Sequence, residues 1–167
     1  LSLAQHRKGF GRLARGERTR TAVLDAAGEK SAHLVGFSMG GMLTQQFAIH
    51  FPRRVRSLAL LGTHSGGPWA VQAAPDVRRL LFDKGRAGAA DELRAMRPHT
   101  YARGTSDALF EEDALVRLAN QPTLRDYRAQ LYALLYWSAY LALPKFGFPT
   151  LVMHGAQDAL IPPANGR

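Results

Sequence analysis

The sequence of 167 residues contains no cysteine. This absence excludes a disulfide framework, a thiolate zinc site and a cysteine nucleophile. It also fits the cytoplasm, where thiols stay reduced and structural disulfides are rare. We therefore expect a cytoplasmic protein.

Long apolar runs are missing as well. The longest apolar segment, Leu131 to Leu143, is interrupted by Trp137-Ser138 and closed by Pro144. It is too short and too aromatic for a clear membrane span. The N-terminus shows no apolar stretch followed by a small-residue cleavage site. The sequence therefore predicts no membrane partner.

Acidic residues are few beside basic ones, and the formal net charge is +9 at pH 7. Such a charge could attract nucleic acid. The arginines, however, are scattered singly or in pairs, without a dense run or an aromatic platform. This pattern favours a solvated surface over a nucleic-acid interface. Hydrophobic residues make up 46% of the chain, enough for one globular domain with a buried core.

The most informative stretch is Gly36-Phe37-Ser38-Met39-Gly40. The apolar run His33 to Phe37 leads into it, and a helix-like segment, Met42 to His50, follows. Strand, sharp turn with serine, and helix form the context of a nucleophile elbow. Gly36 and Gly40 are expected to give the small neighbours that such a strained turn needs. The alternative is an ordinary turn serine.

The chain around this stretch predicts an α/β fold with a mostly parallel sheet. His33 to Phe37 reads as a fully buried strand, and Val55 to Leu61 as a second one, so the intervening helix completes a βαβ unit. Strand character returns at Pro149 to His154. The other expected elements are a strand remnant at Leu1–Gln5, a basic loop at Arg7–Arg12, and helices over Arg18–Ala27, from Pro75, over Ala89–Met96, from a Ser106 cap to Asn120, and from a Thr123 cap to Leu141.

This order divides a single domain into three parts. Residues 1–64 form a core part with the elbow, and residues 147–167 bring a further core strand. Residues 65–146 form a helical cap, or lid, inserted between them. It is expected to lie over the carboxyl edge of the sheet, where ligands bind in open α/β folds.

A serine needs a base to take its proton and a third group to orient that base. Asp158 follows the strand Thr150 to His154 and is expected at the same sheet edge as Ser38. A carboxylate there could orient a histidine; the alternative is a turn aspartate that caps its own backbone. Met39, directly after the serine, would supply one backbone N–H to an oxyanion hole.

Three segments together resemble the α/β-hydrolase fold superfamily: Val35 to Gly41, the Gly9-Phe10-Gly11 loop, and Pro149 to Pro163. Within it they are most similar to 3-oxoadipate enol-lactonases and related carboxylesterase-like serine hydrolases. The resemblance implies an enzyme that cleaves a small-molecule ester or lactone, with Ser38 as nucleophile and Asp158 as triad acid. It implies no metal and no organic cofactor. Because the elbow carries a serine, the resemblance is weaker to those branches of the superfamily whose nucleophile is an aspartate.

The chain also departs from this family. The family order is Ser, Asp, His, but no histidine follows Asp158. The family's glycine loop appears as His6 to Leu13 with three positions changed. We therefore interpret the chain as an internal fragment that lacks the first strands and the catalytic histidine segment, and expect it to be nearly inactive. His64 is the best internal substitute, although a plain loop histidine is the simpler interpretation.

Alternative functions remain open. A cofactor-free haloperoxidase or perhydrolase and a C–C bond hydrolase share the same triad. A non-catalytic binding protein of the same fold is the alternative from another functional class. A nucleic-acid-binding module is the alternative that the sequence favours least. Aromatic residues in the helical segment could favour an apolar substrate or simply form core: Phe110, Tyr127, Tyr132, Tyr136 and Trp137. The sequence does not indicate the oligomeric state.

Overall fold

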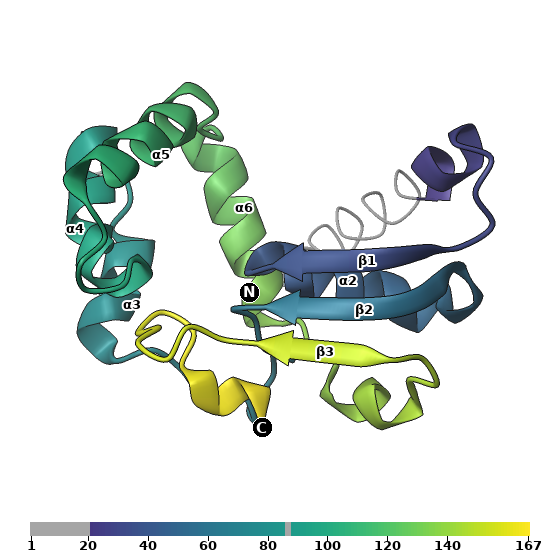
Figure 1. The fold of residues 1–167 in the computed structure, drawn as a ribbon. Coiled ribbons are helices and arrows are strands. Elements are labelled where there is room, and N and C mark those ends of the chain that lie inside the picture. Colours follow the sequence, from purple (N-terminus) through teal and green to yellow (C-terminus); the bar gives the residue numbers. More distant parts are fainter. Residues whose placement is uncertain (1–20, 86–87) are drawn as a thin grey trace.

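The computed structural model describes residues 21–85 and 88–167 (Figure 1). The strand remnant expected at residues 1–5 and the basic loop at residues 7–12 lie outside the described residues. Residues 21–26 are helical. This agrees with the second half of the helix expected over residues 18–27.

Three parallel strands form the sheet, in the spatial order β1 (Ala32–Phe37), β2 (Val55–Leu61) and β3 (Thr150–Met153). Helix α2 (Met39–His50) connects β1 to β2. A helix between two paired parallel strands is a βαβ unit, so the predicted α/β class and parallel sheet are confirmed. Helix α2 begins directly after Ser38, three residues earlier than expected.

The apolar face of α2 packs on one face of this sheet. Phe47 is fully buried, and Ala48 and Val55 are buried beside it. Half-buried side chains from distant parts of the chain complete this core: Leu24, Leu34, Phe51, Phe146 and Phe148. The burial of this apolar surface fixes α2 to the sheet.

Among the described residues, four α-helices lie between β2 and β3: α3 (Pro75–Phe82), α4 (Ala89–Thr100), α5 (Asp107–Ala119) and α6 (Leu124–Leu135). Figure 1 shows them beyond the arrowheads of the strands, at the carboxyl edge of the sheet. The predicted start signals are confirmed, because Pro75 opens α3 and the hydroxyls of Ser106 and Thr123 accept backbone N–H groups of α5 and α6. In the described stretches, no helix combines the length and the apolar character that a bilayer span requires.

Two of the expected helix ends were wrong. Helix α4 continues past Pro98 to Thr100, because the Thr100 hydroxyl donates to Met96 O (3.0 Å) and Tyr101 N–H donates to Arg97 O (3.0 Å), which closes the last turn. Helix α6 ends at Leu135 and not at Leu141. The chain leaves the helix there because the Trp137 indole turns into the core.

That tryptophan joins the helical insertion, which is the part of the chain between β2 and β3, to the sheet layer. Trp137 is 2% exposed and packs with Met42, Ala139 and Ile161. Its indole Nε1–H donates a buried hydrogen bond to Gln46 Oε1 on α2 (2.7 Å). A buried indole N–H needs such a partner. The 3₁₀ helices η1 (Pro52–Arg54), η2 (Tyr140–Lys145) and η3 (Pro163–Gly166) are short connections.

The expectation of a fully buried β1 was wrong for one face of the sheet. The register aligns Val35 with Ala59 and Leu151, and Phe37 with Leu61 and Met153. Because side chains alternate between faces, these residues share the face opposite α2. Val35 and Phe37 are 67% and 66% exposed there. An exposed apolar sheet face of this kind favours association with other surfaces.

We expect Val35→Thr to reduce self-association, because it replaces an exposed methyl group by a hydroxyl of the same shape. The free energy of unfolding should stay within about 0.5 kcal/mol. The matched change Val55→Thr, at a strand position only 7% exposed, should lower it by about 1–3 kcal/mol, because a buried hydroxyl loses its hydration. Light scattering and urea denaturation measure the two effects. Equal destabilisation by both substitutions would show that the Val35 face is covered.

Candidate active site

Ser38 lies at the carboxyl end of β1, at the point where the chain turns into α2. Its φ of 52° and ψ of −122° make it the one non-glycine residue with positive φ in the described parts of the chain. Its N–H still donates to Leu61 O (2.9 Å), so pairing with β2 continues up to the serine. Its carbonyl accepts Gly41 N–H (2.9 Å) at the start of α2. Such strain persists only where the surroundings fix it, and it is typical of functional positions.

The glycines around Ser38 explain how the helix passes so close to the strand. A Cβ on Gly36 would lie 2.4 Å from Thr44 Oγ1 and 2.6 Å from Gly40 O. A Cβ on Gly41 would lie 2.6 Å from the Thr63 side chain. A Cβ on Gly40 would meet nothing within 4 Å. The expected role of Gly36 is therefore supported, whereas the role given to Gly40 was wrong and belongs to Gly41.

The loop after β2 is fixed to this turn by side-chain hydrogen bonds. Thr63 Oγ1 donates to Ser38 O (2.8 Å), and Gln45 Nε2 donates to His64 O (3.1 Å). Thr63 and Gln45 are both buried. Neither residue was predicted from the sequence. The hydroxyl directly after Gly62 at the end of the strand was the available signal for Thr63.

A cavity of about 890 Å³ opens from Ser38 toward the helical insertion. Ser38, Met39 and Met42 line its floor from the elbow and α2, together with His64. Its walls are mainly aliphatic and come from α3, α4, α6 and the segment after β3: Leu80, Leu81, Leu93, Met96, Leu131, Leu134, Leu135, Leu160 and Ile161. A cavity of this size and lining suits a small molecule with a large apolar part.

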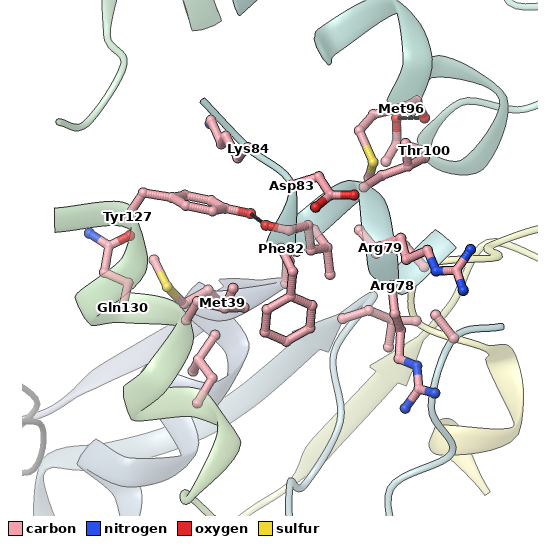
Figure 2. Close-up of a pocket in the computed structure, with 18 of the residues that line it drawn as sticks. Met39, Arg78, Arg79, Phe82, Asp83, Lys84, Met96, Thr100, Tyr127 and Gln130 are labelled. Atoms are coloured by element: carbon pink, nitrogen blue, oxygen red, sulfur yellow. Dashed lines mark hydrogen bonds between the residues drawn. The ribbon is translucent and has the colours of Figure 1, made fainter. Parts of the chain in front are cut away.

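Polar and charged side chains of α3, α4 and α6 also line this cavity. Figure 2 shows Phe82 pointing from α3 toward Met39, whereas Arg78 and Arg79 extend on the side of α3 away from Tyr127. The Tyr127 hydroxyl donates to Leu81 O (3.0 Å), and Lys84 Nζ lies 4.3 Å from the centre of the Tyr127 ring. Burial, and then the negative charge of Glu92, raise the pKa of Tyr127. These contacts hold α6 against α3.

Met39 is the first residue of α2 and also lines the cavity. Its N–H belongs to the first turn, whose amides have no acceptor within the helix. It donates to no acceptor among the described residues. The helix dipole further favours negative charge at this end. The arrangement is compatible with the predicted oxyanion donor.

Asp158 follows β3 at the same edge of the sheet. A Cβ on Gly62, at the end of β2, would lie 3.5 Å from Asp158 Oδ2. Asp158 Oδ1 accepts the N–H groups of Leu160 (3.0 Å) and Ile161 (2.8 Å). The turn-capping role considered for this aspartate is therefore present. Oδ2 accepts no hydrogen bond from the residues that the structure describes, so one oxygen is left for another partner.

Among the histidines with described positions, only His64 lines the cavity with Ser38. His33 Nδ1 lies 2.7 Å from Ser57 Oγ on the sheet, and His50 ends α2. His154 follows β3 with both ring nitrogens buried and without hydrogen-bond partners. Within the described ranges, no three or more His, Asp or Glu side chains are grouped to hold a metal ion.

The aromatic residues considered for the cavity lie mostly elsewhere. Phe110 and Trp137 are each 2% exposed and belong to the packed interior. Tyr127 lines the large cavity, whereas Tyr132 lines a separate pocket of about 50 Å³ beside α3 and α6. The interpretation of these rings as core is therefore correct for Phe110 and Trp137, and aliphatic side chains form most of the apolar lining.

Comparison with known proteins agrees with this geometry. The family model for the alpha/beta hydrolase fold matches residues 17–167. A poly(3-hydroxyalkanoate) depolymerase of Ectopseudomonas oleovorans is 31% identical over 150 residues, which cover 87% of this chain and 51% of the relative. A 2-hydroxy-6-oxononadienedioate/2-hydroxy-6-oxononatrienedioate hydrolase of Paraburkholderia phymatum is 32% identical over 154 residues, covering 87% and 52%.

The solved structure of a 2-hydroxy-6-oxo-6-phenylhexa-2,4-dienoate hydrolase from Rhodococcus sp. strain RHA1 has the same fold. Its TM-score is 0.74 at 21% identity, and the match covers 94% of this chain and 58% of that one. The chain thus spans about half the length of the curated relatives that it matches.

The glycine geometry predicts a sharp difference between neighbouring positions. Gly36→Ala and Gly41→Ala should each lower the free energy of unfolding by about 3 kcal/mol or prevent folding, because the new methyl group meets backbone or a buried side chain. Gly40→Ala is the matched control. It should leave the free energy unchanged or raise it by up to about 1 kcal/mol, because alanine favours the helix. Chemical denaturation of the three variants tests this; a strongly destabilised Gly40→Ala would contradict the geometry.

Proposed function

The chain belongs to the alpha/beta hydrolase fold family, and from this premise we propose that the protein is a serine hydrolase that cleaves a carboxylic ester or lactone. The observation that carries the proposal is Ser38, held at φ 52° between a strand and a helix and facing a cavity of about 890 Å³. Relatives named as hydrolases and as a polyester depolymerase support it.

The proposed chemistry is acyl transfer. Ser38 Oγ attacks the carbonyl carbon, its proton passes to a base, and the Met39 N–H stabilises the negative charge on the carbonyl oxygen. The alcohol leaves with the proton from that base, and the acyl group stays on Ser38 until water releases it as acid. Asp158 would orient the base through Oδ2. The base in this mechanism is a histidine, as in the Ser, Asp, His order of the family.

The lining of the cavity supports a substrate with an aliphatic acyl part. The helical cap, residues 65–146, would cover this part and exclude water from the bond that breaks. Leu131 and Leu134 on α6 line the same cavity as Leu160 and Ile161. A long alkyl group there would bury apolar surface, at about 25 cal/mol per Å².

A C–C bond hydrolase is the second candidate. A 2-hydroxy-6-oxononadienedioate contains carboxylates and a ketone but no ester, so hydrolysis of the compound in the relative's name must break a carbon–carbon bond. Arg78, Arg79 and Lys84 also line the cavity, together with the carboxylates of Asp83 and Glu92. The three cationic side chains favour an anionic substrate. A perhydrolase or a binding protein of this fold has no such observation in its favour.

Imidazole can replace a missing histidine, and this gives a test with the chain itself. We expect hydrolysis of ethyl hexanoate by the 167-residue chain to be near the uncatalysed rate, because loss of the base removes most of the catalysis. Added imidazole should raise the rate by at least about tenfold, and Ser38→Ala should abolish that increase. Release of hexanoate measured by chromatography, with the reaction of imidazole alone subtracted, gives the rates.

Ser65→Ala is the matched control, since Ser65 lies in the nearby loop but does not line the cavity. Its rate should equal that of the unchanged chain. An imidazole-dependent rate that survives Ser38→Ala would sink the serine mechanism. Cleavage of a 2-hydroxy-6-oxo dienoate acid without cleavage of ethyl hexanoate would favour the second candidate.

Asp158→Asn removes the negative charge of this residue but keeps an oxygen that can cap the turn. The amide oxygen can still accept the N–H groups of Leu160 and Ile161, so the free energy of unfolding should fall by no more than about 1 kcal/mol. The imidazole-dependent rate should fall severalfold or more, because the imidazolium formed during attack loses its negative partner. An unchanged rate in a folded Asp158→Asn variant would restrict this residue to the turn.

A further inference from the structure

The most informative group outside the proposed machinery is His64, in the loop that follows β2. His64 lines the same cavity as Ser38. Its loop is fixed on two sides: Gln45 on α2 donates to His64 O (3.1 Å), and Ala139 N–H donates to Ser65 O (2.7 Å). The ring is therefore held at one place relative to the elbow.

The hydrogen bonds of the ring decide where its proton lies. Gly66 N–H donates to His64 Nδ1 (2.9 Å), so this nitrogen must present a lone pair. Burial also lowers the pKa of His64, which favours the neutral ring. A neutral ring with Nδ1 as acceptor carries its hydrogen on Nε2. That N–H donates to no acceptor among the described residues.

This arrangement answers the question of whether His64 replaces the missing base. A base for Ser38 needs an unprotonated nitrogen, but the free nitrogen of His64 carries a proton and the unprotonated one is bound to Gly66. Acting as a base would require the ring to give up the Gly66 bond. What the ring can offer in this position is a hydrogen-bond donor.

We propose that His64 is a substrate-positioning residue: its Nε2–H donates a hydrogen bond to an oxygen of a carbonyl-containing, largely apolar ligand bound in the cavity. The inference rests on the proposed function of this cavity as a substrate site. Apolar groups form most of the surface of the lining, so a side-chain donor fixed in place has a large effect on ligand orientation. Ligands of the same shape without an acceptor would leave that N–H unpaired.

Two probes of nearly equal shape test this donor. Acetophenone has a carbonyl group where α-methylstyrene has a methylene group. In the chain labelled with ¹⁵N-histidine, NMR should show the Nε2–H form of His64, and acetophenone should shift the Nε2 resonance. Replacement by leucine, His64→Leu, should weaken acetophenone binding about tenfold and leave α-methylstyrene binding unchanged.

His64→Gln keeps an N–H near the position of Nε2 and should recover most of the affinity for acetophenone. His99→Leu, on α4 and outside the cavity, is the matched control and should bind both probes like the unchanged chain. An Nδ1–H form of His64, or equal binding of acetophenone by His64→Leu, would overturn the inference, as would a chain that binds neither probe. Because binding does not need the serine hydroxyl, Ser38→Ala should bind both probes normally, so a failure here is distinct from a failure of the hydrolase proposal.

Discussion

The close approach of helix α2 to the ends of β1 and β2 is the constraint on which the rest of the structure depends. Only glycine at positions 36 and 41 leaves room for Thr44 and Thr63. The approach forces Ser38 into a backbone conformation that side chains rarely adopt. That conformation is maintained by hydrogen bonds on both sides, from Ser38 N–H to Leu61 O and from Thr63 Oγ1 to Ser38 O. A helix that lay further from the strand would relax the serine and separate it from the cavity.

The same helix also organises the cavity. The N-terminal end of α2 brings Met39 and Met42 to its floor, and Gln45 fixes the loop of His64. Further along α2, Gln46 accepts the Trp137 indole N–H and so joins the helical insertion to the sheet layer. Polar side chains that are buried on a helix are stable only with such partners. In α2 these partners position the residues that surround Ser38.

The sheet has a second face that α2 does not cover. Val35, Phe37, Leu151 and Met153 are each more than half exposed there. Parallel sheets in α/β proteins are usually covered on both faces. The relatives are about twice as long as the part that this chain matches. This face is therefore available for packing against other surfaces.

Much of the fold could be predicted because its signals are local. The pattern of hydrophobic residues and the turn residues predicted the βαβ unit and β3. The capping residues Ser106 and Thr123 predicted the starts of α5 and α6. The end of α4 at Thr100 and the end of α6 at Leu135 could not be predicted, because a closing hydrogen bond decides the first and the core contact of Trp137 decides the second. The exposed face of β1 was missed for a similar reason: apolar composition does not state what lies against a strand.

The sequence by itself determined that a serine stands between a strand and a helix, and that an aspartate follows a later parallel strand. Only the tertiary structure decided which glycines the elbow needs and which oxygen of Asp158 accepts the hydrogen bonds of its turn. It also decided which nitrogen of His64 carries the proton. The physical reason is the separation along the chain between the residues that interact. A motif records neighbours along the chain, whereas close packing and hydrogen bonds join residues that are far apart in sequence.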